Sequence, residues 1–138
     1  MSKLYRTILI DPEARRVTEQ KIEITNAALH QWIGAETLDN FGLASFPGGY
    51  KDMCWVDDGG LSRGESIYAF LLPTAKDPVA GKCLIIGANA IGETASCRIP
   101  IEILRQDITW LGLIRPEVVW DRTETGERAI VTYSRVKP

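Results

Sequence analysis

The sequence predicts a single α+β domain with a mainly antiparallel sheet of about five to seven strands and two helices. Short apolar or alternating segments recur along the chain and are separated by Gly, Pro, Asp and Asn, whereas only two segments carry apolar residues at helical spacing. The length of 138 residues, with 45% hydrophobic and 25% charged residues, suits one ordinary globular domain. We expect a core over residues 1–112 and a C-terminal hairpin over residues 113–138 that serves as an oligomerisation element.

The N-terminal segment predicts an antiparallel hairpin formed by Leu4–Ile10 and Val17–Ile24. The second strand alternates apolar and polar residues, which is typical of a strand with one buried face. Asp11-Pro12-Glu13 lies between the strands and predicts a turn, because proline fixes φ at the second turn position.

A short helix is predicted next. Thr25 or Asn26 can accept a hydrogen bond from a free amide of its first turn. Gly34 suits the position that follows the last turn. Apolar residues recur between them at helical spacing and predict the inner face: Ala28, Leu29, Trp32 and Ile33.

Strand character returns at Leu38–Phe46, breaks at Pro47-Gly48-Gly49 and returns at Met53–Val56. Asp57-Asp58-Gly59-Gly60 predicts the tight turn of a hairpin, because aspartate followed by glycine supplies the positive φ that such turns need. Ile67–Leu72 is apolar enough for a strand or a buried helix, and its periodicity does not decide between them.

The next segment predicts a loop at Lys76–Gly81 and a central strand at Cys83–Ile86, which is continuously apolar. Gly87–Gly92 is expected to turn the chain, and Thr94–Arg98 to run back. Pro100 suits the first turn of a second helix.

That second helix is predicted to end at Gly112, with Trp110 on its inner face and apolar residues at i, i+3, i+7 and i+10: Ile101, Leu104, Ile108 and Leu111. Glu117–Trp120 and Ala129–Val136 then predict a hairpin around Thr123–Gly126. An isolated hairpin is marginal in water, so its apolar face must dock on its own sheet or on a neighbouring subunit. We therefore expect a homo-oligomer.

Composition and charge exclude several function classes. The formal net charge is -2 and the basic residues are scattered, which argues against a binder of duplex nucleic acid and against an acidic DNA mimic. Cys54, Cys83 and Cys97 lack C-x-x-C spacing and predict buried thiols in a reducing compartment. The N-terminal residues lack the apolar region of a secretion signal, and no window approaches the roughly 20 apolar residues of a membrane span. We expect a cytoplasmic protein without a membrane partner.

No catalytic signature stands out. His30 is the only histidine, which excludes a histidine-rich metal site and leaves a packed or polar-face residue, or a general base. Asp57 and Asp58 are adjacent and would point to opposite sides of a strand, so they predict a turn rather than a catalytic carboxylate pair. Gly87-x-x-x-x-Gly92 lacks the Lys-Ser/Thr of a phosphate loop. We expect no metal and no cofactor.

A ligand site is predicted around Arg63. Its guanidinium could grip a phosphate while Trp55, Tyr50 or Tyr68 stacks on a base, and Arg98 and Asn89 could reach the same face from the neighbouring hairpin. The alternative makes Arg63 a solvated surface residue and the aromatic residues fillers of the sheet.

The order of features over residues 29–111 resembles a family of small phage- and plasmid-borne proteins, the domain-of-unknown-function 3846 family. The matching segments are Gln31-Trp-Ile-Gly34, Phe41-Gly-Leu-Ala-Ser-Phe46, Met53-Cys-Trp-Val-Asp-Asp-Gly-Gly-Leu61, Pro78-Val-Ala-Gly81 and Cys83-Leu-Ile-Ile-Gly87. The resemblance implies a mobile element in a bacterial host cell, and it transfers no catalytic residue.

The expectation is therefore a non-enzymatic binding protein of a phage or mobile element. By analogy of setting and size, it would sequester a small anionic nucleotide-type defence signal or block a host protein. A small-molecule enzyme that uses His30 or a carboxylate, and a structural or assembly protein, are the alternatives.

Overall fold

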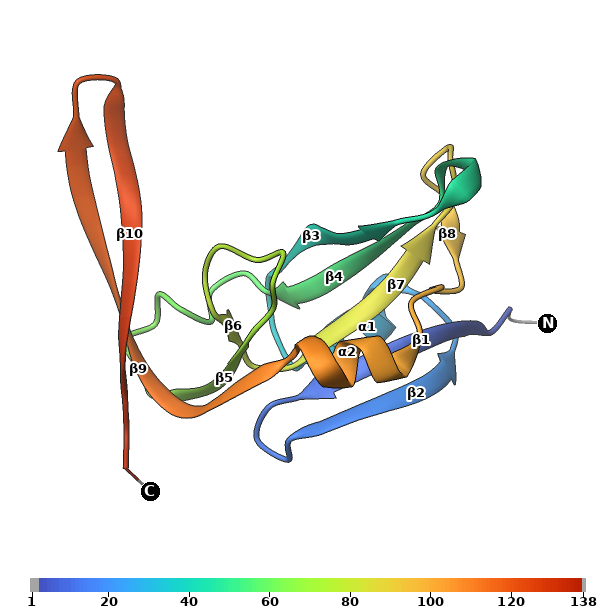
Figure 1. Cartoon of the computed structure of the whole chain (residues 1–138), viewed down its shortest axis with the longest axis horizontal. Coiled ribbons are helices and arrows are strands. Elements are labelled where there is room, and N and C mark those ends of the chain that lie inside the picture. Colours follow the sequence, from blue (N-terminus) through green and yellow to red (C-terminus); the bar gives the residue numbers. More distant parts are fainter. Residues whose placement is uncertain (1–2, 138) are drawn as a thin grey trace.

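In the described part of the chain, two antiparallel sheets and two α-helices make up the fold (Figure 1). The computed structural model describes residues 3–137; Met1, Ser2 and Pro138, which the expected domain ranges include, lie outside it. In order, the elements are β1 (Tyr5–Asp11), β2 (Arg16–Ile22), α1 (Asn26–Ile33), β3 (Leu38–Ser45), the 3-10 turn η1 (Pro47–Gly49), β4 (Lys51–Asp57), β5 (Ile67–Leu71), β6 (Val79–Ala80), β7 (Cys83–Ala88), β8 (Thr94–Ala95), α2 (Ile101–Asp107), β9 (Thr109–Thr123) and β10 (Gly126–Arg135).

The first sheet has six strands within residues 3–137, in the order β2-β1-β7-β4-β3, with β8 paired to β7. This confirms the α+β class and the expected size of the sheet. A second sheet of four strands, in the order β10-β9-β5-β6, was not expected. Residues 83–86 of β7 are all buried and lie between β1 and β4, so the predicted central strand is confirmed.

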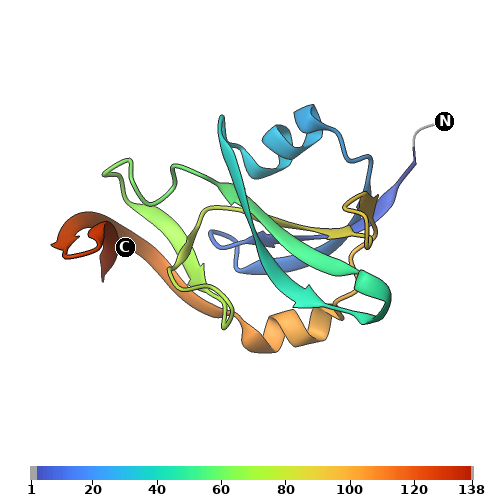
Figure 2. The ribbon, with the colours of Figure 1, turned by 90° about the horizontal axis from the view of Figure 1, so that it is seen from above.

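Local signals place the first three elements correctly. Asp11 closes the β1–β2 turn by accepting hydrogen bonds at its Oδ1 from the amides of Glu13 and Ala14. The Thr25 hydroxyl accepts a hydrogen bond from the amide of Ala28 at 3.0 Å, and Gly34 ends α1 with a φ of 76°. The helices α1 and α2 cover opposite faces of the first sheet (Figure 2).

The second helix is shorter than predicted. It ends at Asp107, and β9 begins at Thr109, so Trp110 lies on a strand with its ring edge-on to Phe70, 5.9 Å between centroids. The spacing of Ile108 and Leu111 suggested a longer helix, but the two side chains pack in different clusters: Ile108 lies with Leu104 and Phe70, and Leu111 lies with Ala69 and Ile114. The strand β9 also contains a bulge. Ala69 pairs with Gly112 and Phe70 with Trp110, so one strand holds an extra residue, and Gly112 has a φ of 73°. The bulge lets Leu111 and Ile114 both face inward although they lie three residues apart, as on a helix.

The hairpin predicted at Asp57–Gly60 is wrong. The strand β4 pairs with β3 and β7, whereas β5 pairs with β6 and β9, so this turn carries the chain from one sheet to the other. Neither Gly59 nor Gly60 has a positive φ. The Asp57 carboxylate instead accepts a hydrogen bond from the Gly59 amide at 3.0 Å. A local turn signal does not specify which strands pair beyond it.

The segment Ile67–Leu72 forms a strand over Ile67–Leu71, and the predicted loop at Lys76–Gly81 contains the two-residue strand β6. The three cysteines are buried and free, as expected. Between residues 3 and 137, neither helix has the length and hydropathy that a membrane span requires.

The C-terminal hairpin forms around the predicted turn, but its first strand starts earlier than expected. β9 runs without interruption from Thr109, where it pairs with β5, to Thr123, where it pairs with β10. It therefore crosses the expected junction between residues 112 and 113. The distal part of the hairpin extends away from the rest of the molecule (Figure 1).

Candidate functional site

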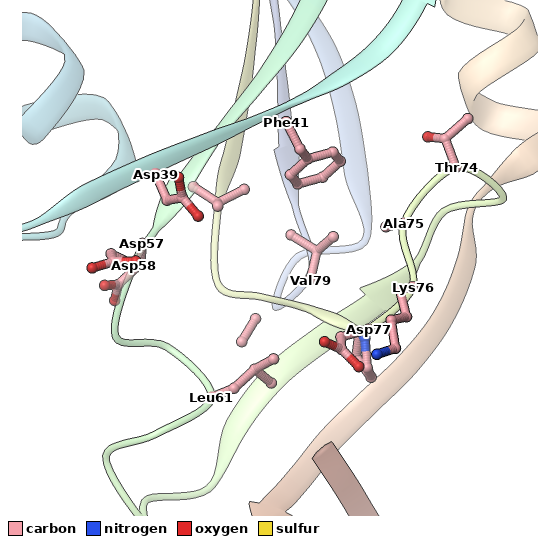
Figure 3. A pocket seen from close by; sticks show the side chains of 13 residues that line it. Asp39, Phe41, Asp57, Asp58, Leu61, Thr74, Ala75, Lys76, Asp77 and Val79 are labelled. Atoms are coloured by element: carbon pink, nitrogen blue, oxygen red, sulfur yellow. The ribbon is translucent and has the colours of Figure 1, made fainter. Parts of the chain in front are cut away.

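A cleft of about 320 Å³ lies where the two sheets meet (Figure 3). Three segments line it: Asp39 and Phe41 of β3, residues 56–58 and Leu61 at and after the end of β4, and residues 74–80 leading into β6. We call it the inter-sheet cleft. The cleft exists because the chain leaves the first sheet after Asp57 and then forms β5 and β6 of the second sheet.

The floor of the inter-sheet cleft is apolar. Phe41 and Val56 pack against the main core cluster, and Val79, which belongs to that cluster, is only 4% exposed. Asp39 pairs with Val56 across the β3–β4 ladder, so both side chains point to the side of the sheet that faces the cleft. The site therefore combines a rigid hydrophobic base with a carboxylate beside it.

The rim is acidic. Asp39, Asp57 and Asp58 lie on one side of the inter-sheet cleft, and Asp77 lies across from them beside Lys76 (Figure 3). The carboxylates are spread around the rim rather than convergent. Within residues 3–137, no three His, Cys, Asp or Glu side chains are placed to hold one metal ion.

Arg63 neutralises one of these carboxylates. Its Nη2 donates to Oδ1 of Asp57 at 2.7 Å, and its Nη1 donates to Oδ2 of the same residue. Partial burial alone would raise the pKa of Asp57, but the hydrogen bonds from Arg63 and the Gly59 amide, with the charge of Arg63, hold this pKa below its ordinary value. The bidentate grip that the sequence suggested for a phosphate is thus used on a carboxylate of the same chain.

Arg63→Ala is expected to raise the pKa of Asp57, because burial then acts without the opposing cation. In the wild type, the folded-state pKa is depressed. The stabilisation from this pair is therefore present above the unfolded value of about 3.9 and is lost as pH falls through the lower folded value. Carbon-detected NMR titration of the Asp57 carboxyl group measures the change. Lys76→Ala, which removes a cation of the same cleft that forms no ion pair within residues 3–137, is the control. An unchanged Asp57 titration in Arg63→Ala would contradict the assignment.

The other predicted ligand residues do not gather around Arg63. Trp55 points to the opposite face of the first sheet, where it packs against the cluster of Leu29, Leu84 and Ile86. Tyr68 lies on β5 of the second sheet. The Asn89 side chain is engaged in its own turn, since its Oδ1 accepts from the amides of residues 91 and 93.

Tyr50 and Arg98 do come together. The Arg98 guanidinium carbon lies 3.5 Å from the centroid of the Tyr50 ring, a cation–π contact. Arg98 forms no ion pair within residues 3–137, and its side chain is exposed. This pair lies at the β3–β4 turn, at the opposite end of β4 from the inter-sheet cleft.

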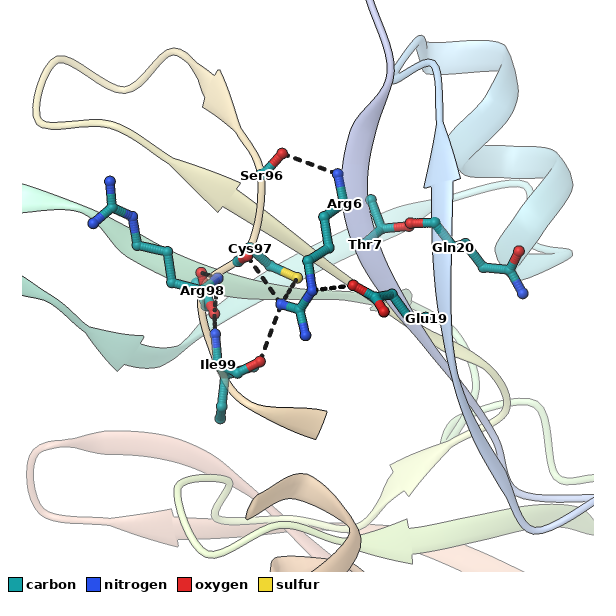
Figure 4. Close-up of polar contacts among 9 residues, drawn as sticks. Arg6, Thr7, Glu19, Gln20, Ser96, Cys97, Arg98 and Ile99 are labelled. Atoms are coloured by element: carbon teal, nitrogen blue, oxygen red, sulfur yellow. Dashed lines mark hydrogen bonds and ion pairs between the residues drawn. The ribbon is translucent and has the colours of Figure 1, made fainter. Parts of the chain in front are cut away.

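Sequence reasoning missed a buried polar network next to this pair (Figure 4). Asp52 is 1% exposed and accepts hydrogen bonds from the amides of Arg98 and Ile99, the latter at 2.7 Å. Burial raises the pKa of Asp52 and outweighs both these hydrogen bonds and the nearby charges of Arg6 and Arg98. The alternation of β4 indicates that Asp52 is buried, because residue 52 lies on the same inward side of the strand as residues 54 and 56.

Arg6, on β1, forms hydrogen bonds to the segment between β8 and α2. Its Nη1 donates to the carbonyl oxygens of Cys97 and Ile99 at 3.0 and 3.1 Å, and its Nε pairs with Glu19. Burial is the main cause that raises the pKa of Cys97 to about 11. The thiol therefore stays protonated near neutral pH and is a poor nucleophile. This network holds residues 97–99 in place ahead of α2.

His30 has a local partner. Its Nδ1 lies 2.8 Å from the carbonyl oxygen of Ala35, just beyond the end of α1, and the residue does not line the inter-sheet cleft.

Searches against protein-family models, curated proteins and solved structures gave no match to this chain, so the chemistry proposed for the inter-sheet cleft rests on its lining residues alone.

Proposed function

We propose that this protein is a non-enzymatic binding protein of a phage or mobile element, and that it engages a host protein by accepting a lysine or arginine side chain in the inter-sheet cleft. The observation that carries the proposal is the combination of an apolar floor with an acidic rim in one cleft. The setting rests on the family resemblance of residues 29–111.

Charge in the cleft favours a cation. Asp39, Asp58 and Asp77 form no ion pair within residues 3–137, and Lys76 is the single cation among the lining residues. Lysine and arginine carry an apolar stem and a charged head. The stem would lie on Phe41 and Val79, and the head would reach the rim. An anionic nucleotide would be repelled by the same carboxylates.

A second candidate function places an anionic nucleotide elsewhere. The Arg98–Tyr50 pair is exposed on its arginine side and has no carboxylate partner within residues 3–137. Arginine presents planar donors that suit a phosphate. Because the guanidinium already covers one face of the Tyr50 ring, a base would stack on the guanidinium instead. This arrangement supports the nucleotide-sequestering alternative.

NMR titration of the labelled protein separates the two functions. We expect N-acetyl-arginine amide and N-acetyl-lysine amide to shift the amide signals of residues 39–41, 57–61, 74–77, 79 and 80. The triple variant Asp39→Asn, Asp58→Asn, Asp77→Asn should weaken this binding about tenfold, since each exposed ion pair contributes about 0.2–1 kcal/mol. Asp121→Asn, which removes a hairpin carboxylate paired to Arg128, is the matched control.

The result that would overturn the cleft proposal is an equal response to uncharged N-acetyl-norleucine amide, or no response to the cationic probes at millimolar concentration. Cyclic di-AMP serves as the anionic probe in the same titration. If it shifts signals around Tyr50 and Arg98, Arg98→Ala abolishes these shifts, and the cationic probes give no response in the cleft, the nucleotide function replaces the protein-binding one.

We also propose that the protein forms a homo-oligomer through the β9–β10 hairpin. The hairpin exposes large apolar side chains that nothing else in residues 3–137 covers. Trp120 is the most exposed of them, at 68%. Sedimentation equilibrium at micromolar concentration measures the assembly.

A further inference from the structure

The β9–β10 hairpin has one apolar face. Residues that are opposite each other in an antiparallel pair point to the same side, and the register joins Trp120 to Ala129, Val118 to Val131 and Pro116 to Tyr133. We call these six residues the apolar stripe. The other face holds one apolar pair, Val119 with Ile130, between polar pairs.

The outer edge of the hairpin is open. β10 is an end strand of its sheet and is ten residues long. It contains no proline, and its register with β9 runs without a bulge. Natural edge strands are commonly protected by short length, proline, bulges or charged side chains. β10 has none of the first three, and its charged residues, Glu127, Arg128 and Arg135, lie outside the central segment 129–134. Its outward backbone groups can therefore accept another strand.

We propose that β10 pairs antiparallel with β10 of a second copy of this chain, around a two-fold axis at Val131. This joins the two four-stranded sheets into one continuous sheet. The inference rests on the proposed homo-oligomer and specifies its interface. The second copy is the occupant because the sequence of β10 is complementary to itself in this register.

The rows across the joined sheet carry that complementarity. At the centre, Val131 faces Val131 of the second copy, with Val118 on each outer side. In the next row, Ala129 lies between Trp120 of its own hairpin and Tyr133 of the second copy. The small side chain leaves room for the two aromatic rings to meet above it, which shields one side of Trp120, the most exposed large apolar residue of the hairpin.

The outer rows match in charge. Glu127 lies opposite Arg122 in its own hairpin and would lie opposite Arg135 of the second copy, so each carboxylate is flanked by two guanidinium groups. On the reverse face, Arg128 would lie opposite Ser134 and Ile130 opposite Thr132, with no like charges in direct opposition. An axis at Ile130 would instead place Glu127 opposite Tyr133 and lose the ion pair.

Cysteine cross-linking tests the register. The three native cysteines are at most 3% exposed, so an engineered exposed thiol reacts alone. In Val131→Cys, the axis places the two thiols directly opposite each other, and mild oxidation should give a covalent dimer. Val119→Cys, on β9 and on the reverse face, is the matched control and should remain uncross-linked.

Charge reversal gives an independent test. Arg135→Glu should weaken the dimer about tenfold in sedimentation equilibrium, because both Glu127–Arg135 contacts become repulsive. The triple variant Arg122→Glu, Glu127→Arg, Arg135→Glu should restore most of the affinity, because it reverses every charge of this row and keeps position 127 opposite a charge of the other sign within its own hairpin.

The outcomes separate this inference from the proposed functions. A dimer that cross-links through position 131 and not through position 119 supports the edge pairing. A dimer without cross-linking at position 131 overturns the edge pairing and leaves the homo-oligomer standing. A monomer at micromolar concentration overturns both, and the NMR titration of the cleft decides the binding function separately.

Discussion

Phe70→Ala is expected to lower the free energy of unfolding by about 3–5 kcal/mol. Phe70 belongs to β5 of the second sheet, yet it is fully buried in the core cluster that contains Ile8, Ile10 and Cys54 of the first sheet. The walls of the resulting cavity would come from both sheets and could not collapse around it without moving one sheet against the other. The lost edge contact with Trp110 adds to the cost.

Urea denaturation followed by tryptophan fluorescence measures this effect. Tyr68→Ala is the matched control, because it removes a partly exposed aromatic side chain from the same strand. We expect a clearly smaller loss for Tyr68→Ala. Equal losses for the two variants would contradict the assignment of Phe70 as the residue that joins the sheets.

Asp52→Ala is expected to lower the free energy of unfolding by about 2–4 kcal/mol. The Asp52 carboxylate is the acceptor for the amides of Arg98 and Ile99, and a buried amide left without an acceptor costs about 1–3 kcal/mol. Asp39→Ala is the control, since that carboxylate is exposed and, within residues 3–137, accepts a hydrogen bond only from the amide of the next residue. A loss below about 0.5 kcal/mol for Asp52→Ala, the range of ordinary surface changes, would contradict the structural role.

The stability that Asp52 contributes changes with pH in a definite direction. Because burial raises the folded-state pKa of Asp52 above its unfolded value, folding favours the protonated carboxyl group. The stabilisation from this group is therefore present below the unfolded value of about 3.9 and is lost as pH rises through the raised folded value. Asp57, whose pKa is lowered, changes stability in the opposite direction. Asp52→Asn should remove the pH dependence of stability that comes from Asp52 and leave the one that comes from Asp57.

The ligand residues show how far sequence reasoning reached. Arg63 was grouped with Trp55 and Tyr68 because all lie near the Asp57–Gly60 turn in the sequence. In the structure, the turn passes between sheets, so Trp55 faces α1 while Arg63 folds back onto Asp57. The inter-sheet cleft was missed because its carboxylates come from β3, from the turn after β4 and from the loop before β6. No local pattern links these three segments.

The sequence by itself determined the elements whose causes lie within a few residues. These are the β1–β2 hairpin, the capped helix α1, the apolar central strand β7 and the turn of the C-terminal hairpin. Their signals are turn residues, caps and periodicity, which act between near neighbours in the chain. Only the tertiary structure decided how the strands divide between two sheets, where α2 ends, and which charges pair. These features depend on contacts between segments far apart in the sequence. Ile108 and Leu111 have the three-residue spacing of a helix but pack in two different core clusters, and only the pairing of β9 with β5 shows that Leu111 lies on a strand.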